Sequence, residues 1–460
     1  MPPKPPTLRP YQAAAVDSVR AAYRAGKHRP LLVLPTGGGK TVCFSHITAG
    51  AAAKGNRVMI LVHRQELMAQ CSRSLADIGV AHGLISAKRT ADPTHHVQVA
   101  SVQTLVRRLD HIQAPNLIIM DEAHHAMAGS WARVLTHYPQ ARVLGVTATP
   151  CRLDGGNLGD VFDELIIGPQ VSELMAAGYL CPVSYYAPST VDLAGVHTVA
   201  GDYNRKELNE RVDKPTITGD AIAHYRKLAH GLPCVVFCAS VAHAENVCAQ
   251  YVSAGYQARI LEGTMTDAAR ADAVAALADG RITHLVTVDI VSEGFDLPVV
   301  TVCQMLRATQ SLGLYLQQLG RVLRTHPGKQ KAIVLDHVGN VLRHGFAEEP
   351  RDWTLTGSMR RKRGAKDDGP RYAQCPQCYA VHPPAPICPV CGTARDIKDR
   401  EPEQVEGSLE ELKVTAERIQ ARRSQGQAQS LGDLIALGKS RGMKNPFGWA
   451  QHVFRARLRK

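Results

Sequence analysis

The sequence contains no apolar run of about 18 or more residues, so no segment is long enough to cross a membrane as a helix. Its first residues, MPPKPPTL, lack the apolar core of a signal peptide. No internal repeat and no heptad pattern is present, which argues against a repeat array or a coiled coil. Acidic residues are few, 41 against 54 Lys and Arg, and the formal net charge is +13. This charge favours nucleic acid as a partner, although a solvated basic surface has the same composition.

The chain has 460 residues, too many for one compact core, and its hydrophobic content of 45% is that of a globular protein. We therefore expect two to four domains. Of the 12 cysteines, eight are scattered through apolar segments, as expected of reduced, buried thiols. This usage predicts a cytoplasmic protein.

Short apolar runs alternate with helical patterns twice along the chain, which predicts two α/β lobes, each with a parallel sheet. In the first lobe the runs are LLVL (31–34), RVMILV (57–62), VQVA (97–100), NLIIM (116–120) and RVLGV (142–146). In the second they are CVVFCA (234–239), ARIL (258–261), HLVTV (284–288), VVTVCQ (299–304) and KAIVLD (331–336). The predicted boundaries are 1–7 disordered, 8–168 first lobe, 169–230 connection, 231–346 second lobe, 347–372 basic linker, 373–395 cysteine module and 396–460 helical tail.

The stretch LPTGGGKT (34–41) predicts a phosphate-binding loop, because a strand precedes it and a helical pattern follows. It departs from the generic pattern at Leu34, where a glycine is usual. Glycines let the backbone curl and aim its N–H groups at phosphate oxygens. Lys40 is placed to reach the β- and γ-phosphates of ATP, and the Thr41 hydroxyl to bind Mg²⁺. The alternative is a purely structural glycine turn.

The residues DEAH (121–124) follow the predicted strand 116–120, about 80 residues after the glycine loop. At that place Asp121 is suited to hold Mg²⁺, and Glu122 to polarise the attacking water as a general base. In the second lobe, QQLGRVLR (317–324) puts Arg321 and Arg324 on one helix face, from which they could reach the γ-phosphate across a cleft. Ordinary surface charge is the alternative for both patterns.

In order and content, these motifs resemble those of the superfamily 2 helicases and translocases over residues 8–345. The resemblance implies two tandem RecA-like lobes, and its own phosphate loop tolerates Leu34. It implies an ATP- and Mg²⁺-dependent helicase or translocase. Within the superfamily, TATPCRLDGGNLGDVFDEL (147–165) and LDHVGNVLRHG (335–345) are similar to the RadD-like DNA helicases of bacteria and phages.

The resemblance also implies roles for further residues. The adenine-reading segment LRPYQ implicates Arg9 and Gln12, and the loop itself adds Thr36, Gly37, Gly38 and Gly39. His124, Thr147 and Thr149 match the coupling motifs, and Gln317 belongs to the sixth motif. Gly294 and Asp296 match the fifth motif at the cleft. Arg64, Gln103 and Thr104 are candidates for contacts with the nucleic-acid backbone.

The expected function is a nucleic-acid-dependent ATPase that moves or remodels DNA in repair, recombination or phage replication. RNA is the rival substrate, since phosphates are gripped in both. A slow clamp or a restriction-type motor subunit that works with a partner protein is the rival role. Further expected partners are a single-strand-binding or recombination protein, and the default state is a monomer with no membrane contact.

Four cysteines, Cys375, Cys378, Cys388 and Cys391, form the pattern C-x₂-C-x₉-C-x₂-C. Two such knuckles can place four thiolates around Zn²⁺, in a small zinc-ribbon-like module whose stability would come from the metal. A disulfide pair or an iron–sulfur cluster are the alternatives. In the tail, Asn445 and Pro446 predict a helix start, and the basic and aromatic residues from 439 onwards suit a phosphate backbone or a solvated cap equally.

Overall fold

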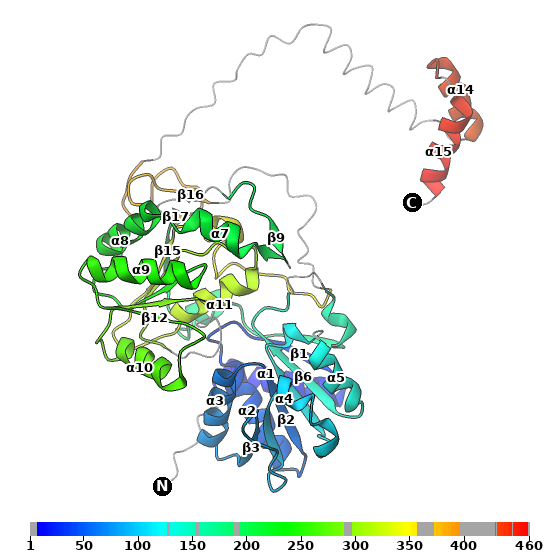
Figure 1. The fold of residues 1–460 in the computed structure, drawn as a ribbon. Coiled ribbons are helices and arrows are strands. Elements are labelled where there is room, and N and C mark those ends of the chain that lie inside the picture. The colour runs from blue at the N-terminus through cyan, green and yellow to red at the C-terminus, as the bar shows by residue number, and fades with distance from the viewer. Residues whose placement is uncertain are drawn as a thin grey trace. The chain divides into compact units, whose positions relative to one another are not determined.

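The computed structural model describes residues 7–126, 129–151, 156–187, 193–199, 201–288, 297–356, 372–394, 428, 430–443 and 445–458. The chain forms two compact units, residues 1–395 and residues 396–460. The first unit holds both predicted lobes, coloured blue to cyan and green to yellow in Figure 1. No helix of the described residues is long and apolar enough to span a membrane.

The first lobe is built on a seven-stranded sheet in the order β3-β4-β2-β5-β6-β1-β7, and every pairing is parallel. Its strands are β1 (Pro30–Val33), β2 (Val58–Val62), β3 (His82–Ile85), β4 (Val97–Ser101), β5 (Leu117–Asp121), β6 (Arg142–Thr147) and β7 (Glu164–Ile167). The helices are α1 (Pro10–Arg24), α2 (Lys40–Ala52), α3 (Gln65–Asp77), α4 (Val102–Leu105) and α5 (Gly129–His137), with short 3₁₀ turns η1 (Leu109–His111), η2 (Ala123–His125) and η3 (Leu158–Asp160).

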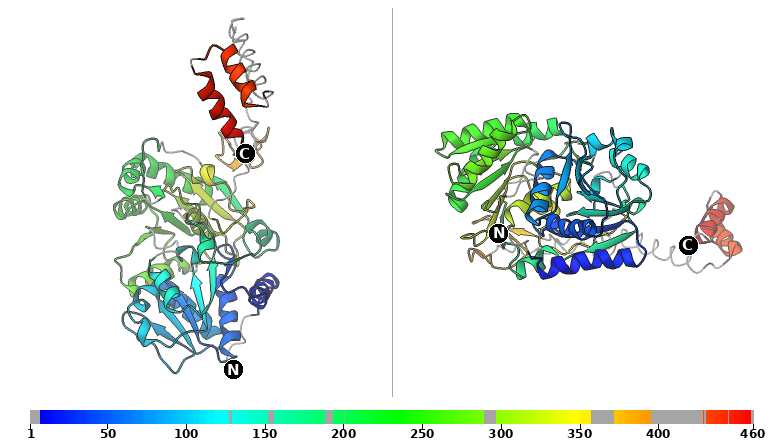
Figure 2. Two further views of the ribbon diagram at one scale, coloured as in Figure 1. Left: turned by 90° about the vertical axis from the view of Figure 1, so that its right-hand side faces the viewer. Right: turned by 90° about the horizontal axis from the view of Figure 1, so that it is seen from below.

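Alternate residues of the buried strands point to opposite faces of this sheet, and each face has its own apolar layer. Leu32 of β1 packs in the layer that contains Val16 of α1 and Phe44 of α2. Its neighbour Leu31 packs in the other layer, with Trp131 of α5. Helices cover both faces, as a parallel sheet requires, and the strands predicted from apolar runs are confirmed (Figure 2).

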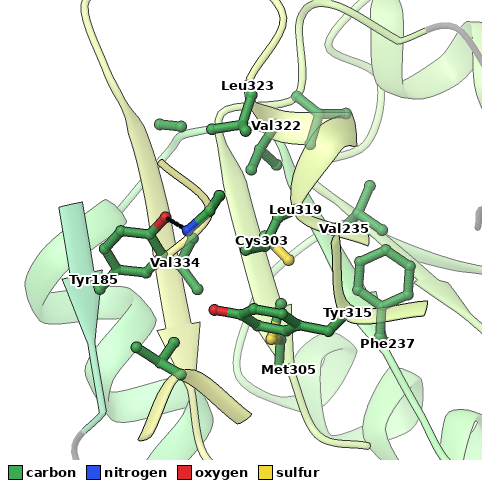
Figure 3. Close-up of a cluster of buried hydrophobic side chains, with 14 of the residues drawn as sticks. Tyr185, Val235, Phe237, Cys303, Met305, Tyr315, Leu319, Val322, Leu323 and Val334 are labelled. Carbon is green, nitrogen blue, oxygen red and sulfur yellow. Dashed lines mark hydrogen bonds between the residues drawn. The ribbon is translucent and has the colours of Figure 1, made fainter. Parts of the chain in front are cut away.

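The second lobe has a six-stranded parallel sheet in the order β12-β13-β11-β14-β15-β8. Its strands are β8 (Val183–Tyr186), β11 (Cys234–Phe237), β12 (Ala258–Leu261), β13 (His284–Thr287), β14 (Val302–Met305) and β15 (Ala332–Asp336). Its helices are α8 (Pro215–Ala229), α9 (Val241–Ser253), α10 (Asp267–Ala278), α11 (Leu312–Val322) and α12 (Asn340–His344). Tyr315 and Leu319 of α11 pack beside Cys303 and Met305 of β14 in the core (Figure 3).

Residues 169–230, which we predicted to connect the lobes, belong largely to the second lobe. They contain α6 (Val171–Ala176), α7 (Arg205–Val212), α8 and a hairpin of β9 (Thr198–Val199) and β10 (Asp202–Tyr203). They also contain β8, which pairs with β15 as the edge strand of the second sheet. A boundary at residue 231 is therefore too late, because a short four-residue strand separated from the others along the chain gives no repeating pattern in the sequence.

Part of the predicted basic linker also packs on the fold. The Leu355 carbonyl accepts a hydrogen bond from Gly159 N of the first lobe (3.1 Å), and Trp353 packs against the same lobe. Arg351 is buried and donates to the carbonyls of Ala347 and Phe346 at 3.0 and 2.8 Å. The chain after the second lobe thus returns to the first before it reaches the cysteines.

The cysteine module docks on the second lobe beside β8. Its two short strands are β16 (Ala373–Gln374) and β17 (Val381–His382). Ala380 forms an antiparallel bridge with Tyr186, and Ala187 N donates to the Tyr379 carbonyl at 3.1 Å. From its composition we expected the metal alone to stabilise the module. Its buried residues Cys375, Ala380 and Cys388 also pack against the core of the second lobe.

The second unit contains a pair of helices, α14 (Leu431–Ser440) and α15 (Pro446–Leu458). Leu434 and Ala450 are buried between them. Asn445 caps α15 by accepting a hydrogen bond from Gly448 N (2.9 Å), which confirms the predicted helix start. Arg441 lies 5.7 Å from the Trp449 ring, so one of the basic side chains covers an aromatic of the same unit.

Candidate functional site: a cleft between the two lobes

The glycine loop joins β1 to α2, as the sequence predicted. Gly37 and Gly39 have φ of +86° and +80°, a region that other residues rarely adopt. A Cβ on Gly38 would lie 2.9 Å from the Pro35 carbonyl oxygen, and one on Gly39 would lie 2.2 Å from Nε2 of Gln12. A side chain at any of these three glycine positions would therefore strain the loop. The loop leads directly into the N-terminus of α2, where backbone N–H groups attract phosphate.

The two acids lie at the end of β5, facing the loop. Nζ of Lys40 is 3.3 Å from Oε1 of Glu122, and both side chains are nearly buried. Asp121 is buried beside Glu122, and burial, followed by the Glu122 charge, raises the pKa of Asp121 to about 7. A carboxyl in this position can hold a divalent cation, which would favour its charged form. Glu122 has φ of 52°, in the left-handed region that residues other than glycine seldom adopt.

An ion-pair contact and then hydrogen bonds link Glu122 to the end of β6. Nδ1 of His124 lies 3.5 Å from Oε2 of Glu122 and 3.1 Å from the Thr147 hydroxyl. That hydroxyl donates to the Thr149 carbonyl and accepts from Thr149 N, both at 3.2 Å. The residues assigned to coupling thus form one connected set that begins at the acid pair.

Helix α11 of the second lobe closes the opposite side of the cleft. Gln317 and Arg321 are largely buried there, and Arg324 lies just beyond the end of the helix. Gly320 touches the loop so closely that a Cβ would be 2.2 Å from the Cβ of Thr36. The cleft has a volume of about 430 Å³, a size that suits a nucleotide. It is lined by Arg9, Gln12, Thr36, Gly37, Gly39, Lys40, Thr41, Asp121, Glu122, Gln317, Arg321 and Arg324, among others.

Tyr179 is a cleft residue that sequence reasoning missed. Its ring lies 5.1 Å from the ring of Tyr11, and the Arg9 guanidinium lies 4.7 Å from its centroid. The Tyr11 hydroxyl donates to the Gly38 carbonyl (3.0 Å), which ties this aromatic pair to the phosphate loop. Tyr179 follows α6 in a segment with no motif, so only the fold could bring it beside Arg9 and Gln12.

An ion pair between the lobes was also missed. Nη1 of Arg270, on α10, meets Oε1 of Glu66, on α3, and both side chains are mostly buried. Arg270 also donates to the carbonyls of Gly263 and Met265 at 2.9 and 3.0 Å, so its direction is set by its own lobe. Neither residue carries a sequence signal, because the pair joins positions 204 apart in the chain.

The candidates for nucleic-acid contact lie at the ends of β2 and β4. Nε2 of Gln103 donates to the His63 carbonyl (3.2 Å), so Gln103 and Thr104 lie beside the segment that contains Arg64. Gln103 is exposed, as a contact residue must be. Gly294 and Asp296 lie outside the described residues.

The four predicted zinc ligands are gathered in one place. Their Sγ atoms all lie within 4.8 Å of one another. Sγ of Cys375 is 3.6 Å from that of Cys391, and Sγ of Cys378 is 3.7 Å from that of Cys388. A tetrahedron with Zn–S bonds of about 2.3 Å has edges of roughly 3.8 Å, so the set fits Zn²⁺. His382 instead uses Nδ1 to contact the Pro383 carbonyl at 2.7 Å.

A nucleotide-sized cleft between two parallel-sheet lobes, with a glycine loop and an acid pair on one side and arginines on the other, defines an ATP-hydrolysing motor of the helicase type. Comparison with known proteins agrees. Residues 6–152 match the family described as Type III restriction enzyme, res subunit, and residues 216–326 match the Helicase conserved C-terminal domain.

Two relatives share much of the chain. A 51.5 kDa protein of a Lactococcus phage is 32% identical over 395 residues, covering 84% of this chain and 84% of its own length. IRC3 of Saccharomyces cerevisiae, whose name describes an ATP-dependent helicase, is 30% identical over 73% of this chain, which spans about half of IRC3 (52%). The chain belongs to the superfamily 2 helicases.

Solved structures share the fold at lower identity. The Type ISP restriction-modification enzyme LlaBIII bound to DNA superposes with a TM-score of 0.57 at 14% identity, over 73% of this chain and 28% of that enzyme. A fragment named as an HsdR subunit of a type I restriction enzyme from Vibrio vulnificus gives 0.60 at 19% identity, over 78% of this chain and 68% of that one.

Proposed function

We propose that this helicase is a DNA-dependent motor that translocates on or remodels DNA. The observation that carries the proposal is the cleft, in which Lys40 and Glu122 of one lobe face Arg321 and Arg324 of the other. A group that binds both sides holds the lobes together, and hydrolysis removes the contact that joins them. The two states then differ in γ-phosphate contacts, which is the differential binding that a switch requires.

We assign the following roles as part of this proposal. The loop glycines would cradle the phosphates, and Lys40 would bind the transferred phosphate. Thr41 and Asp121 would hold Mg²⁺, whose charge would offset that of the phosphates. Glu122 would accept a proton from the attacking water, and His124, which lies within ion-pair distance of Glu122, would link it to Thr147 and Thr149.

DNA is favoured over RNA because of the restriction-type likenesses, one of which is to an enzyme bound to DNA. The net charge of +13 supports a polyanionic partner, and contacts through Arg64, Gln103 and Thr104 would give little sequence preference and strong salt dependence. A clamp or motor subunit that acts with a partner protein is the second candidate, because this chain covers only 28% of that enzyme.

For the cysteine cluster we propose a structural Zn²⁺ site held by all four thiolates. The Sγ separations support it, as does the burial of Cys375 and Cys388 against the second lobe. No two of the twelve cysteines are joined by a disulfide in the structure.

The deciding experiment is steady-state ATP hydrolysis by the full chain. We would compare no nucleic acid, single-stranded DNA, duplex DNA, forked DNA and RNA, with Glu122→Gln as the inactive control. Stimulation by DNA and loss of activity in the variant are expected. Stimulation by RNA alone would overturn the assignment of DNA as the substrate. A hydrolysis rate that no nucleic acid changes would favour the role that depends on a partner protein.

A further inference from the structure

The β9–β10 hairpin sends one side chain toward the helix that carries the cleft arginines. Asp202 pairs with Val199 across the hairpin, and its carboxylate reaches the loop 306–311 between β14 and α11. Oδ2 accepts a hydrogen bond from the Thr309 hydroxyl (2.9 Å), and Oδ1 accepts one from Gln310 N (2.7 Å). Nη2 of Arg307 lies 3.6 Å from Oδ2, an ion pair with little exposure on either side. Three residues of the loop, Arg307, Thr309 and Gln310, are thus tied to one carboxylate.

The other side of this loop is held by α12. Oδ1 of Asn340 accepts from Thr309 N (3.0 Å), and its Nδ2 donates to the Arg307 carbonyl (2.9 Å). Thr309 and Asn340 are fully buried and Arg307 is 7% exposed. Buried polar groups lose stability when a partner is removed, so a loop this well bonded has one preferred position. Asp202 supplies a negative charge that faces Arg307 in this network.

The loop decides where α11 begins. The Thr309 hydroxyl accepts from Ser311 N (2.9 Å), and the Ser311 hydroxyl caps the helix by accepting from Leu314 N (3.1 Å). The same helix end touches the first lobe, because a Cβ on Gly313 would be 3.1 Å from Oγ1 of Thr149. A helix transmits displacement at one end to the other, and Arg321 lies roughly 14 Å further along this one.

We propose that Asp202 is a positioning residue for ATP hydrolysis: it holds the loop 307–311 and thereby sets where Arg321 and Arg324 stand opposite the phosphate loop. The inference rests on the proposed role of these arginines. Asp202 is not among the described residues that line the cleft, so it acts through the loop and the helix. The phosphate loop, Gln12 and Tyr179 line the cleft and the Asp202 network is centred on the loop 307–311, so the proposal predicts an effect on the hydrolysis step and little effect on ATP binding.

The test compares Asp202→Ala and Asp202→Asn with the control Asp213→Ala. Asp213 also joins two elements of the second lobe, since both its oxygens accept from Nδ2 of Asn246 at 3.2 Å, but these hydrogen bonds lead to α9 and not to the loop 307–311. With saturating DNA, Asp202→Ala should lower kcat on the order of tenfold or more and leave KM for ATP within about twofold, because misplacement of a catalytic group by about 1 Å has effects of this size. Asp202→Asn keeps an acceptor for Gln310 N and should be intermediate.

A binding measurement separates positioning from general stability. Affinity for ADP should be unchanged in Asp202→Ala, while affinity for ADP with aluminium fluoride, which mimics the transferred phosphate, should fall by a factor similar to that of kcat. Equal losses for both ligands, a kcat like that of Asp213→Ala, or a higher KM at unchanged kcat would overturn the proposal. If thermal melting shows that Asp202→Ala is unfolded, Asp202→Asn decides by the same criteria.

The arginine role is tested separately. Arg321→Ala should abolish hydrolysis under the same conditions. If Arg321→Ala hydrolyses ATP normally, the proposed function of the arginines fails, whatever the Asp202 variants do.

Discussion

Removal of the proposed Zn²⁺ from the four-cysteine cluster should destabilise the second lobe as well as the cluster. The module closes the edge of the second sheet at β8: Ala187 N donates to the Tyr379 carbonyl, and Nε2 of Gln374 donates to the Ala187 carbonyl. Val381 is 6% exposed and packs in the core of the lobe. Without the metal, these contacts should weaken, because the module has few large apolar side chains of its own to keep its two short strands in place.

The size of the effect follows from these contacts. Two hydrogen bonds at about 1 kcal/mol each and the burial of one valine at about 2 kcal/mol give about 4 kcal/mol. For a lobe of this size, that corresponds to a fall in Tm on the order of 10 °C. The assay is thermal melting without nucleotide, before and after chelation, with the released zinc counted by a colorimetric dye.

A pair of variants makes the test independent of chelators. Cys391 is exposed, so Cys391→Ser removes a ligand without opening a cavity, and it should lower Tm as chelation does. Cys248→Ser, a change at a half-buried cysteine of the same lobe outside the cluster, should leave zinc content unchanged. The reasoning is refuted if the protein contains zinc at one ion per chain and its complete removal leaves Tm unaltered.

Three further outcomes are expected. Tyr179→Ala should raise KM for ATP about tenfold, because the adenine base would lose a ring on which to stack, and Tyr179→Phe should stay near wild type. If Tyr179→Ala has the same KM as wild type, Tyr179 does not bind the base. Arg270→Glu places an acid opposite Glu66 between the two lobes and should raise KM for ATP on the order of fivefold. The double variant Arg270→Glu, Glu66→Arg should partly restore KM, and no restoration would mean that this ion pair does not govern closure of the lobes. Burial lowers the pKa of His284 to about 3, so the unfolded chain binds the proton first as pH falls below about 6.5. Stability should then be lost on acidification by about 1.4 kcal/mol per pH unit for this histidine, and His284→Phe should shrink the difference in Tm between pH 7 and 5.5; an undiminished difference would contradict this assignment.

Short stretches of the sequence by themselves determined the strands, the phosphate loop and the cysteine cluster of this protein. Buried parallel strands must be apolar throughout, so runs such as 31–34 and 116–120 identified the sheets. The phosphate loop needs backbone that only glycine adopts, and Gly37 and Gly39 have positive φ as that requirement predicts. Metal knuckles need ligands at short fixed spacing, so the four cysteines were recognisable as one set. In each case the residues that act together are close in sequence.

Tertiary structure decided what depends on distant residues meeting. Strand β8 belongs to the second sheet because it pairs with the edge of β15. Its four residues alone do not show which strand it pairs with. Tyr179 beside Arg9, Glu66 with Arg270, and Asp202 on the loop before α11 join residues from about 100 to more than 200 positions apart. Such contacts follow from the packing of two whole lobes, so no local pattern encodes them, whereas the motifs that bind phosphate carry their chemistry within a single turn of backbone.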